Sequence, residues 1–206
     1  MDHVPSGHDP GMRLLRFSDG LEQAFRRYHL GVFLVRMRWA LLVAAALFLL
    51  FAALDAISLP QPLRSQVLAL RLGLILPALA LAWLATYLPR LHGWLQWIGG
   101  AASLVCGLGV VGIVGVARAH AFPLPYEGII LVIFAFYFLT GLRFMPAVLC
   151  GWLTFAAYLG MEVLAGTPGK VLLYNTFFLG TANVIGTAGC YFLEYAVRQH
   201  FLSQRQ

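Results

Sequence analysis

The residues that could form a ligand site in this 206-residue chain lie at the edges of long apolar runs. Arg71 lies about one turn inside one run, and Glu162 lies near the end of another. A loop stiffened by prolines supplies three more: His120, Tyr126 and Glu127. An ionisable side chain at membrane depth is costly and faces a partner or a cavity. These five residues predict a ligand-binding pocket on the outer face. The alternative is that Arg71 extends to the lipid headgroups and pairs with a nearby acid.

Two histidines flank the apolar region and are candidate metal ligands: His29 precedes the first apolar run and His200 follows the last. Haem b in a helical membrane bundle needs two axial imidazoles that reach one plane from facing helices. The two histidines meet this condition if the first and last helices are neighbours. Since their spacing is not diagnostic, the alternative is that both are ordinary residues at a membrane boundary.

A third group lies along the last apolar run, which continues after Gly189 without a glycine or proline break. Asn183, flanked by Gly186 and Gly189, predicts a close helix contact within the bundle or between two copies of the chain. The residues beyond it recur at spacings of three and four, as in the heptad seam of a coiled coil: Tyr191, Glu194, Arg198, Phe201 and Arg205. Glu194 and Arg198 can also pair within the helix. We interpret Asn183 and the first four seam residues as transmitters of a signal.

Composition indicates an integral membrane protein, because 61% of the residues are hydrophobic and only 11% are charged. Soluble domains are roughly one quarter charged. The net charge of +6 does not indicate nucleic-acid binding, since the basic residues lie at the ends of apolar runs. The sequence contains no HExxH, GxSxG, glycine-rich phosphate loop or DxD-type carboxylate pair, and it leaves no room for a separate catalytic domain. We therefore expect no enzyme activity in this segment.

The pattern of apolar runs predicts an all-α bundle of six transmembrane helices, each near the roughly 20 residues that a bilayer core requires. We place them at residues 35–56, 67–88, 94–117, 128–141, 144–164 and 171–195. Residues 18–34 predict a short amphipathic helix on the inner membrane surface. Residues 1–17 are expected to form a disordered tail. Residues 196–206 are expected to begin a cytoplasmic signalling helix.

The distribution of charge orients this bundle, because short cytoplasmic loops carry an excess of Arg and Lys. Of the 14 basic residues, four lie on the predicted outer side: Arg64, Arg71, Arg118 and Lys170. The other ten lie on the side of the N-terminus: Arg13, Arg16, Arg26, Arg27, Arg36, Arg38, Arg90, Arg143, Arg198 and Arg205. The sequence therefore predicts a multi-pass protein with both termini in the cytoplasm.

The end of the chain resembles the junction in bacterial membrane-anchored nucleotidyl cyclases, where a six-helix anchor leads into a cytoplasmic helix. The similar positions are Tyr191, Glu194, Arg198, Phe201, Leu202 and Arg205. Shorter similarities lie around the first, fourth and fifth runs: Phe25-Arg26-x-Tyr28, Arg36, Arg38, Tyr126-x-Gly128 and Leu142-Arg143-Phe144. In that family a GGDEF diguanylate cyclase or class III adenylate cyclase domain follows the anchor. This chain departs from the pattern because it contains no such domain.

The resemblance implies a sensory and dimerisation domain in the bacterial cytoplasmic (inner) membrane that regulates a C-terminal cyclase. It implies a homodimer in the lipid bilayer, with an unknown small-molecule, lipid or quinone ligand. Some anchors of such cyclases carry haem b and respond to redox or quinone state, so a haem b sensor is a second expectation. The rival from another class is a small complete transporter or lipid-handling protein. The rival predicts that the gene ends near Gln206, whereas the sensor predicts several hundred further residues.

Overall fold

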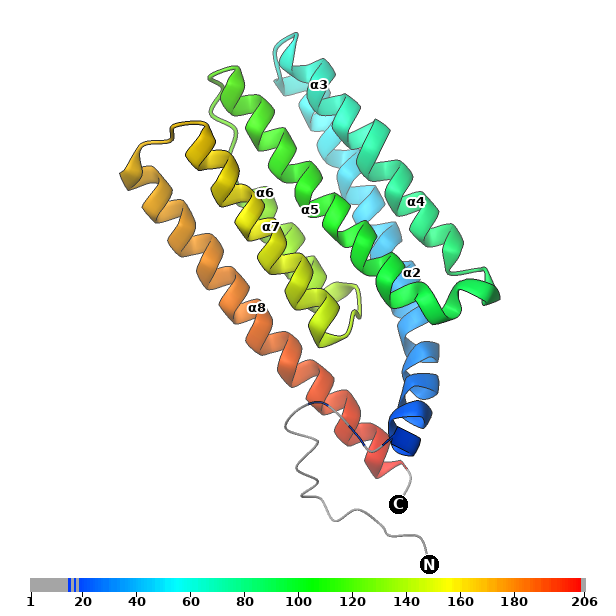
Figure 1. The fold of residues 1–206 in the computed structure, drawn as a ribbon. Helices are drawn as coiled ribbons and strands as arrows, with labels where there is room; N and C mark the ends of the chain where they lie inside the picture. The colour runs from blue at the N-terminus through cyan, green and yellow to red at the C-terminus, as the bar shows by residue number, and fades with distance from the viewer. Residues whose placement is uncertain (1–14, 16, 18, 205–206) are drawn as a thin grey trace, which may run out of the picture.

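A computed structural model of the chain describes Leu15, Phe17 and residues 19–204, which form helices and short connections with no strand among them (Figure 1). In chain order the elements are α2 (Asp19–Ser58), α3 (Leu63–Leu70), the π-helical turn η1 (Arg71–Ile75), α4 (Leu76–Ala85), the 3-10 helix η2 (Pro89–Trp94), α5 (Leu95–Ala119), α6 (Glu127–Phe134), the π-helical turn η3 (Ala135–Leu139), α7 (Phe144–Leu164) and α8 (Gly169–Ser203). The predicted all-α class is therefore confirmed for the described part of the chain.

Five helical segments are long and apolar enough to cross a bilayer, as in a multi-pass membrane protein: Gly20–Ser58, Leu63–Ala85, Pro89–Ala119, Phe144–Leu164 and Gly169–Ser203. The fourth predicted run, 128–141, forms the shorter helix Glu127–Leu139 instead. The eight residues of α6 and the five of η3 rise about 20 Å, less than the roughly 30 Å of a hydrocarbon core. The structure thus contains five helices long and apolar enough to span a bilayer and one shorter apolar helix, and the predicted six spans are not confirmed.

This helix is short because two prolines precede it. Pro123 and Pro125 lack amide donors and lie in the non-helical connection between α5 and α6. The helix therefore begins only at Glu127. The connection itself covers part of the distance from one end of the bundle to the other (Figure 1).

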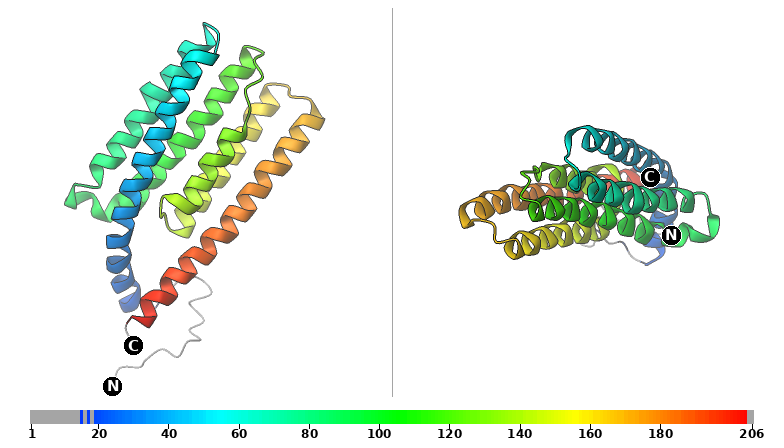
Figure 2. Two further views of the ribbon diagram at one scale, coloured as in Figure 1. Left: turned by 180° about the vertical axis from the view of Figure 1, so that it is seen from behind. Right: turned by 90° about the horizontal axis from the view of Figure 1, so that it is seen from above.

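The helices run roughly along one axis and form an elongated bundle with two ends (Figures 1 and 2). We call one of them the basal end; it holds the start of α2, η2, the start of α7 and the end of α8. The distal end holds the connections that follow α2, α5 and α7. Of the five long segments, the one with α5 is the most enclosed: 61% of its most apolar stretch is buried, against 28–33% in the others. Gly109 of α5 permits this close packing, since a Cβ there would lie 2.7 Å from Ile75 of η1.

α2 is one continuous helix of 40 residues, so residues 18–34 do not form a separate amphipathic helix before the first span. No proline interrupts α2, which is why the helix continues from its polar first turns into its apolar part. The apolar side chains of the first turns are buried within the protein, since Phe25 and Phe33 are 0% and 2% exposed. Other elements of the same chain cover their apolar face.

α8 is the other long helix at the basal end. Its 35 residues span about 52 Å, which exceeds the roughly 30 Å of a hydrocarbon core. It continues past the start of α7 and meets the start of α2 (Figure 1). Phe17 is buried where they meet, although it falls in the predicted disordered tail 1–17. Apart from Leu15, the remainder of that tail lies outside the described residues.

Candidate functional site

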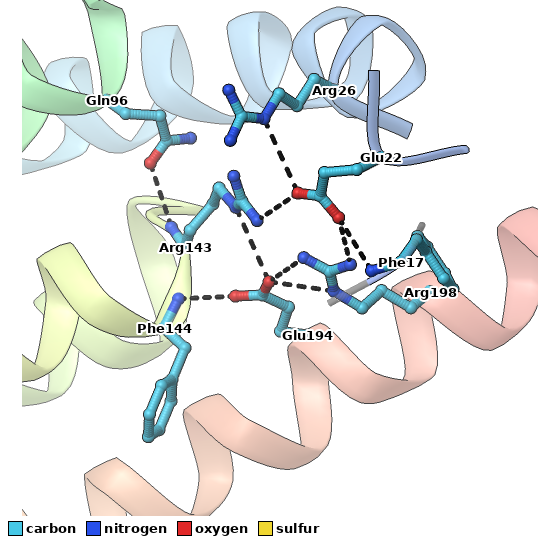
Figure 3. A network of polar contacts seen from close by, with 8 residues as sticks. All are labelled: Phe17, Glu22, Arg26, Gln96, Arg143, Phe144, Glu194 and Arg198. Atoms are coloured by element: carbon cyan, nitrogen blue, oxygen red, sulfur yellow. Dashed lines mark hydrogen bonds and ion pairs between the residues drawn. The ribbon is translucent and has the colours of Figure 1, made fainter. Parts of the chain in front are cut away.

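The densest set of charged contacts lies at the basal end, where α2, α7 and α8 meet (Figure 3). We call it the basal charge cluster, and its members are Glu22, Arg143, Glu194 and Arg198. Glu22 lies in the first turns of α2 and Arg143 just before α7, while the other two lie one turn apart on α8. The cluster joins distant parts of the sequence: 121 positions separate Glu22 from Arg143, and 176 separate it from Arg198.

Arg198 lies at the centre of the cluster, and its side chain is fully buried. Its Nη1 donates to Glu22 Oε2 at 2.9 Å, while Nε and Nη2 donate to Glu194 Oε1 at 3.1 and 2.9 Å. The rings of Phe17 and Phe25 flank the guanidinium, with centroids 5.0 and 4.4 Å from its Cζ. A buried charge is tolerated when it is paired and hydrogen-bonded, and aromatic faces add cation–π attraction. The two acids and two rings thus hold Arg198 in one orientation.

Arg143 contacts the same two acids. Its Nη2 lies 2.8 Å from Glu22 Oε1, and its Nε lies 3.6 Å from Glu194 Oε1. Backbone amides add to the cluster: that of Arg143 donates to Gln96 Oε1 at 3.0 Å, and that of Phe144 donates to Glu194 Oε2 at 2.6 Å. Phe144 is the first residue of α7, where unpaired amides and the helix dipole favour an anion. Glu194 therefore connects α8 to the start of α7.

Glu22 balances the two arginines together with Glu194, so the four members carry no net charge. The Glu22 carboxylate accepts hydrogen bonds from the Phe17 amide at 3.3 Å, from Arg143 at 2.8 Å and from Arg198 at 2.9 Å. Hydrogen bonds between charged groups are the stronger ones, so Glu22 joins the start of α2 firmly to α7 and α8.

Phe201 extends the contact between α8 and α2 beyond the charges. Its ring centroid lies 6.1 Å from that of Phe17, 5.4 Å from that of Phe25 and 5.3 Å from that of Tyr28. The Phe201 side chain is buried in this aromatic group. Apolar packing therefore reinforces the ion pairs at the end of α8.

The predicted heptad seam contacts other helices of the same chain. Glu194, Arg198 and Phe201 are buried against α2, because the first turns of α2 cover this face of α8. Tyr191 packs edge-on against Phe144 with centroids 6.0 Å apart. Arg205, the last seam position, lies outside the described residues. The described seam residues therefore form contacts between helices of one chain.

Asn183 is buried in α8 and also contacts its own bundle. It accepts a hydrogen bond from the Tyr137 hydroxyl at 3.1 Å, and its Nδ2 donates to the Leu179 carbonyl at 3.2 Å. The Tyr137 ring, in η3, lies directly against Gly186, where any Cβ would overlap it. The predicted close contact around Asn183 is present, and it joins α8 to η3.

The residues predicted to form an outer pocket belong to different contacts. Arg71 of η1 makes a 2.6 Å ion pair with Asp55 of α2, and each side chain is 9% exposed. Glu162 instead pairs with Arg118 at 3.1 Å and accepts a hydrogen bond from the Thr167 hydroxyl. Arg71 and Glu162 thus belong to two ion pairs, and the five residues do not assemble into one site. The pairing of Arg71 with a nearby acid, the alternative, agrees with the structure.

The three predicted loop residues have separate surroundings near the distal end. Tyr126 packs against Tyr158 of α7, with ring centroids 6.0 Å apart. His120 is exposed just after α5, where its Nδ1 lies 2.9 Å from the Val116 carbonyl oxygen. Glu127 is exposed at the first position of α6. The loop is therefore attached through Tyr126, while His120 and Glu127 lie at the surface.

The two histidines predicted to hold haem b have different surroundings. His29 stacks on Phe33 with centroids 5.9 Å apart. His200 is exposed, and its Nε2 lies 3.0 Å from Gln204 Nε2. A cavity at the basal end is lined by His29 and His92 but not by His200. This pair therefore does not fit two-imidazole haem ligation. The described residues also contain no group of three or more His, Cys, Asp or Glu suited to a metal ion.

Sequence reasoning missed Glu22 and Arg143 as members of the cluster. An acid in the first turn of a helix is already explained by the helix dipole, and an arginine in a short turn by the positive-inside rule. Neither pattern points to a partner. The available signal was Glu194 with Arg198, four residues apart, and the structure confirms this ion pair at 2.9 Å.

No protein-family model matches this sequence, and a comparison with curated proteins found no match either. The geometry of the basal charge cluster therefore carries the functional argument.

Proposed function

We propose that the chain is a membrane sensory and dimerisation domain that regulates a nucleotidyl cyclase, for cyclic-di-GMP or cAMP synthesis. The observation that carries this proposal is the basal charge cluster. Two arginines and two glutamates fasten the end of α8 to α2 and to the start of α7. A long helix whose end is held by ion pairs can exchange between two arrangements, as interface salt bridges do in known switches.

Glu194 is the link between the bundle and the output in this proposal. One carboxylate accepts from the Phe144 amide of α7 and pairs with Arg143 and Arg198. A shift of α7 by roughly 1–2 Å, typical of helix shifts in switches, would break several of these contacts together. A signal needs only to bind one arrangement more tightly than the other. α8 is unbroken to Ser203 and would carry the change out of the bundle.

The proposed orientation places the basal end in the cytoplasm of a bacterium, below the cytoplasmic (inner) membrane. The positive-inside rule supports it, since these arginines lie on basal parts of the elements: Arg26, Arg27, Arg36, Arg38, Arg90, Arg143 and Arg198. A homodimer is proposed through the face of α8 that points away from the cluster. Ile185 and Phe192 on α8 are 55% and 66% exposed and are available to lipid or to a second copy.

The test is a fusion of a cyclase domain after Gln206, with cyclic nucleotide measured in cells. The variants Glu194→Gln and Arg198→Gln are expected to change its output about five-fold or more, the lower range of allosteric coupling. Gln199→Ala is the matched control, because Gln199 neighbours Arg198 but is exposed and outside the cluster. Variants that reach the membrane normally and leave the output unchanged would contradict the proposal. That result would favour the rival transporter or lipid-handling protein.

A further inference from the structure

A cavity of about 880 Å³ lies at the basal end, next to the basal charge cluster. Its walls come from the first turns of α2, from η2, and from the adjacent parts of α5, α7 and α8. Arg26, Gln96, Arg143 and Phe144 of Figure 3 are among the wall residues. The volume lies within the roughly 300–1,000 Å³ of small-ligand pockets. The cavity is therefore large enough for a lipid headgroup and part of a chain.

One part of the cavity wall is basic. The Arg26 side chain is 68% exposed and reaches Glu22 only at 3.6 Å. Arg27 is exposed and takes part in none of the ion pairs among the described residues. Glu194, the one acid among the described wall residues, has both oxygens engaged within the cluster. The wall thus offers guanidinium donors to an anion without a free carboxylate to repel it.

Another part of the cavity wall is apolar and open to lipid. Trp97, Met145 and Leu149 line the cavity and are 64%, 62% and 48% exposed. They lie in the first turns of α5 and α7, two of the long apolar helices. The cavity is therefore continuous with the surface that these helices present to the bilayer.

We propose that this cavity binds an anionic phospholipid of the leaflet at the basal end. Its phosphate would lie near Arg26 and Arg27, and an acyl chain would lie along Trp97, Met145 and Leu149. A free anion would use only the arginines, and a zwitterionic lipid would gain less from them. An amphiphile with an anionic headgroup satisfies both parts of the wall.

Arg143 gives this site a connection to the cluster, because it lies in the cavity wall and pairs with Glu22 and Glu194. A phosphate that reaches Arg143 competes with these two carboxylates and loosens the hold on α8. This regulatory consequence rests on the proposed sensory function, whereas lipid binding itself does not.

The test is native mass spectrometry of the full chain purified in detergent. Phosphatidylglycerol is titrated against phosphatidylcholine with the same acyl chains, and inorganic phosphate serves as the free anion. Arg27→Gln is expected to weaken phosphatidylglycerol binding about five-fold, the contribution of one arginine near an anionic headgroup. Arg90→Gln is the matched control, since Arg90 is exposed in η2 at the same end but outside the described cavity wall; it is expected to bind like the unaltered chain.

A second variant tests the volume without changing any charge. Gly93 lines the cavity and a Cβ there would meet nothing within 4 Å, so Gly93→Phe fills the space and is expected to weaken binding of both lipids. Equal affinity for the two lipids would overturn the proposal, as would equal losses in Arg27→Gln and Arg90→Gln. Tight binding of inorganic phosphate in place of the lipid would also overturn it. Phosphatidylglycerol binding as expected, together with cluster variants that leave the output of the fused cyclase unchanged, would contradict the proposed sensory function but not the proposed lipid site.

Discussion

Arg198 is the residue on which the basal end depends most. Its guanidinium is fully buried. Glu22 of α2 contacts it from another part of the fold, and Glu194 contacts it from the preceding turn of α8. Glu22 and Glu194 are themselves only 12% and 7% exposed. The removal of Arg198 therefore leaves two shielded carboxylates with Arg143 as the one remaining cation of the cluster.

We expect Arg198→Ala to lower the free energy of unfolding by about 3–5 kcal/mol, the typical cost of breaking a buried ion pair from one side. Thermal unfolding of the detergent-purified chain measures this change. Arg26→Ala is the control, because the Arg26 side chain is 68% exposed, and its loss should change stability by no more than about 1 kcal/mol. Equal effects of the two variants would show that Arg198 makes no special contribution.

Glu22 connects the start of α2 to both arginines of the cluster. We expect Glu22→Gln to lower the free energy of unfolding by about 1–3 kcal/mol, the cost of leaving a buried donor without its acceptor. Thermal unfolding of the detergent-purified chain measures this loss. Glu127→Gln, which alters an exposed acid, should change stability by no more than about 1 kcal/mol.

At the scale of elements, each of the two π-helical turns makes a buried polar contact with another helix. Arg71 begins η1 and pairs with Asp55 of α2, while Tyr137 lies in η3 and bonds to Asn183 of α8. A π-helical turn inserts one residue and redirects the side chains around it. The short fourth helix is thus bound to α8 through η3 although it is not long enough to span a bilayer.

Gly186 tests how tightly η3 and α8 pack. Gly186→Ala forces a Cβ into the Tyr137 ring, and we expect a loss of about 1–3 kcal/mol in stability through overpacking. Gly160→Ala on α7 is the control, because a Cβ there meets nothing within 4 Å and alanine is the better helix former by about 1 kcal/mol. Thermal unfolding should separate the two variants in opposite directions. A stable Gly186→Ala chain would contradict the close contact.

The contrast between helices and cluster shows what this sequence can predict. The runs 35–56 and 144–164 fall in α2 and α7, because the hydropathy of a spanning helix is a local property of about 20 residues. The Glu194–Arg198 pair was predictable for the same reason, since its members are four positions apart. Contacts that cross 121 and 176 positions depend on how the helices pack. Local sequence patterns do not indicate which helices pack together, so Glu22 and Arg143 could not be assigned a partner.

At the scale of the whole molecule, both described ends of the chain lie at the basal end of one elongated bundle (Figure 2). The connection before α6 and the short fourth helix together return the chain to this end. We therefore expect the start of α2 and the end of α8 to lie on the same side of the membrane, and the residues between α2 and α3 to lie on the other side.

Cysteine labelling with a membrane-impermeant maleimide tests this arrangement. Gln199→Cys places a thiol near the end of α8, and Ser65→Cys places one near the distal end; both positions are exposed. The native cysteines at 106, 150 and 190 are buried and should react slowly. In intact cells we expect the distal thiol to react from outside and the basal thiol to react only after lysis. Labelling of both thiols from the same side of the membrane would contradict the placement of the basal and distal ends on opposite sides.

The ion pair between Glu22 and Arg198 also constrains how this protein can evolve. A codon change that neutralises position 198 leaves two acids to share Arg143. One that neutralises position 22 removes one of the two carboxylates that hold the buried guanidinium. Each change alone is expected to destabilise the fold and so to reduce fitness, while the two together leave equal numbers of positive and negative charges in the cluster. Descendants that depart from this pair are therefore expected to have substituted both positions, 176 residues apart, within a short span of ancestry.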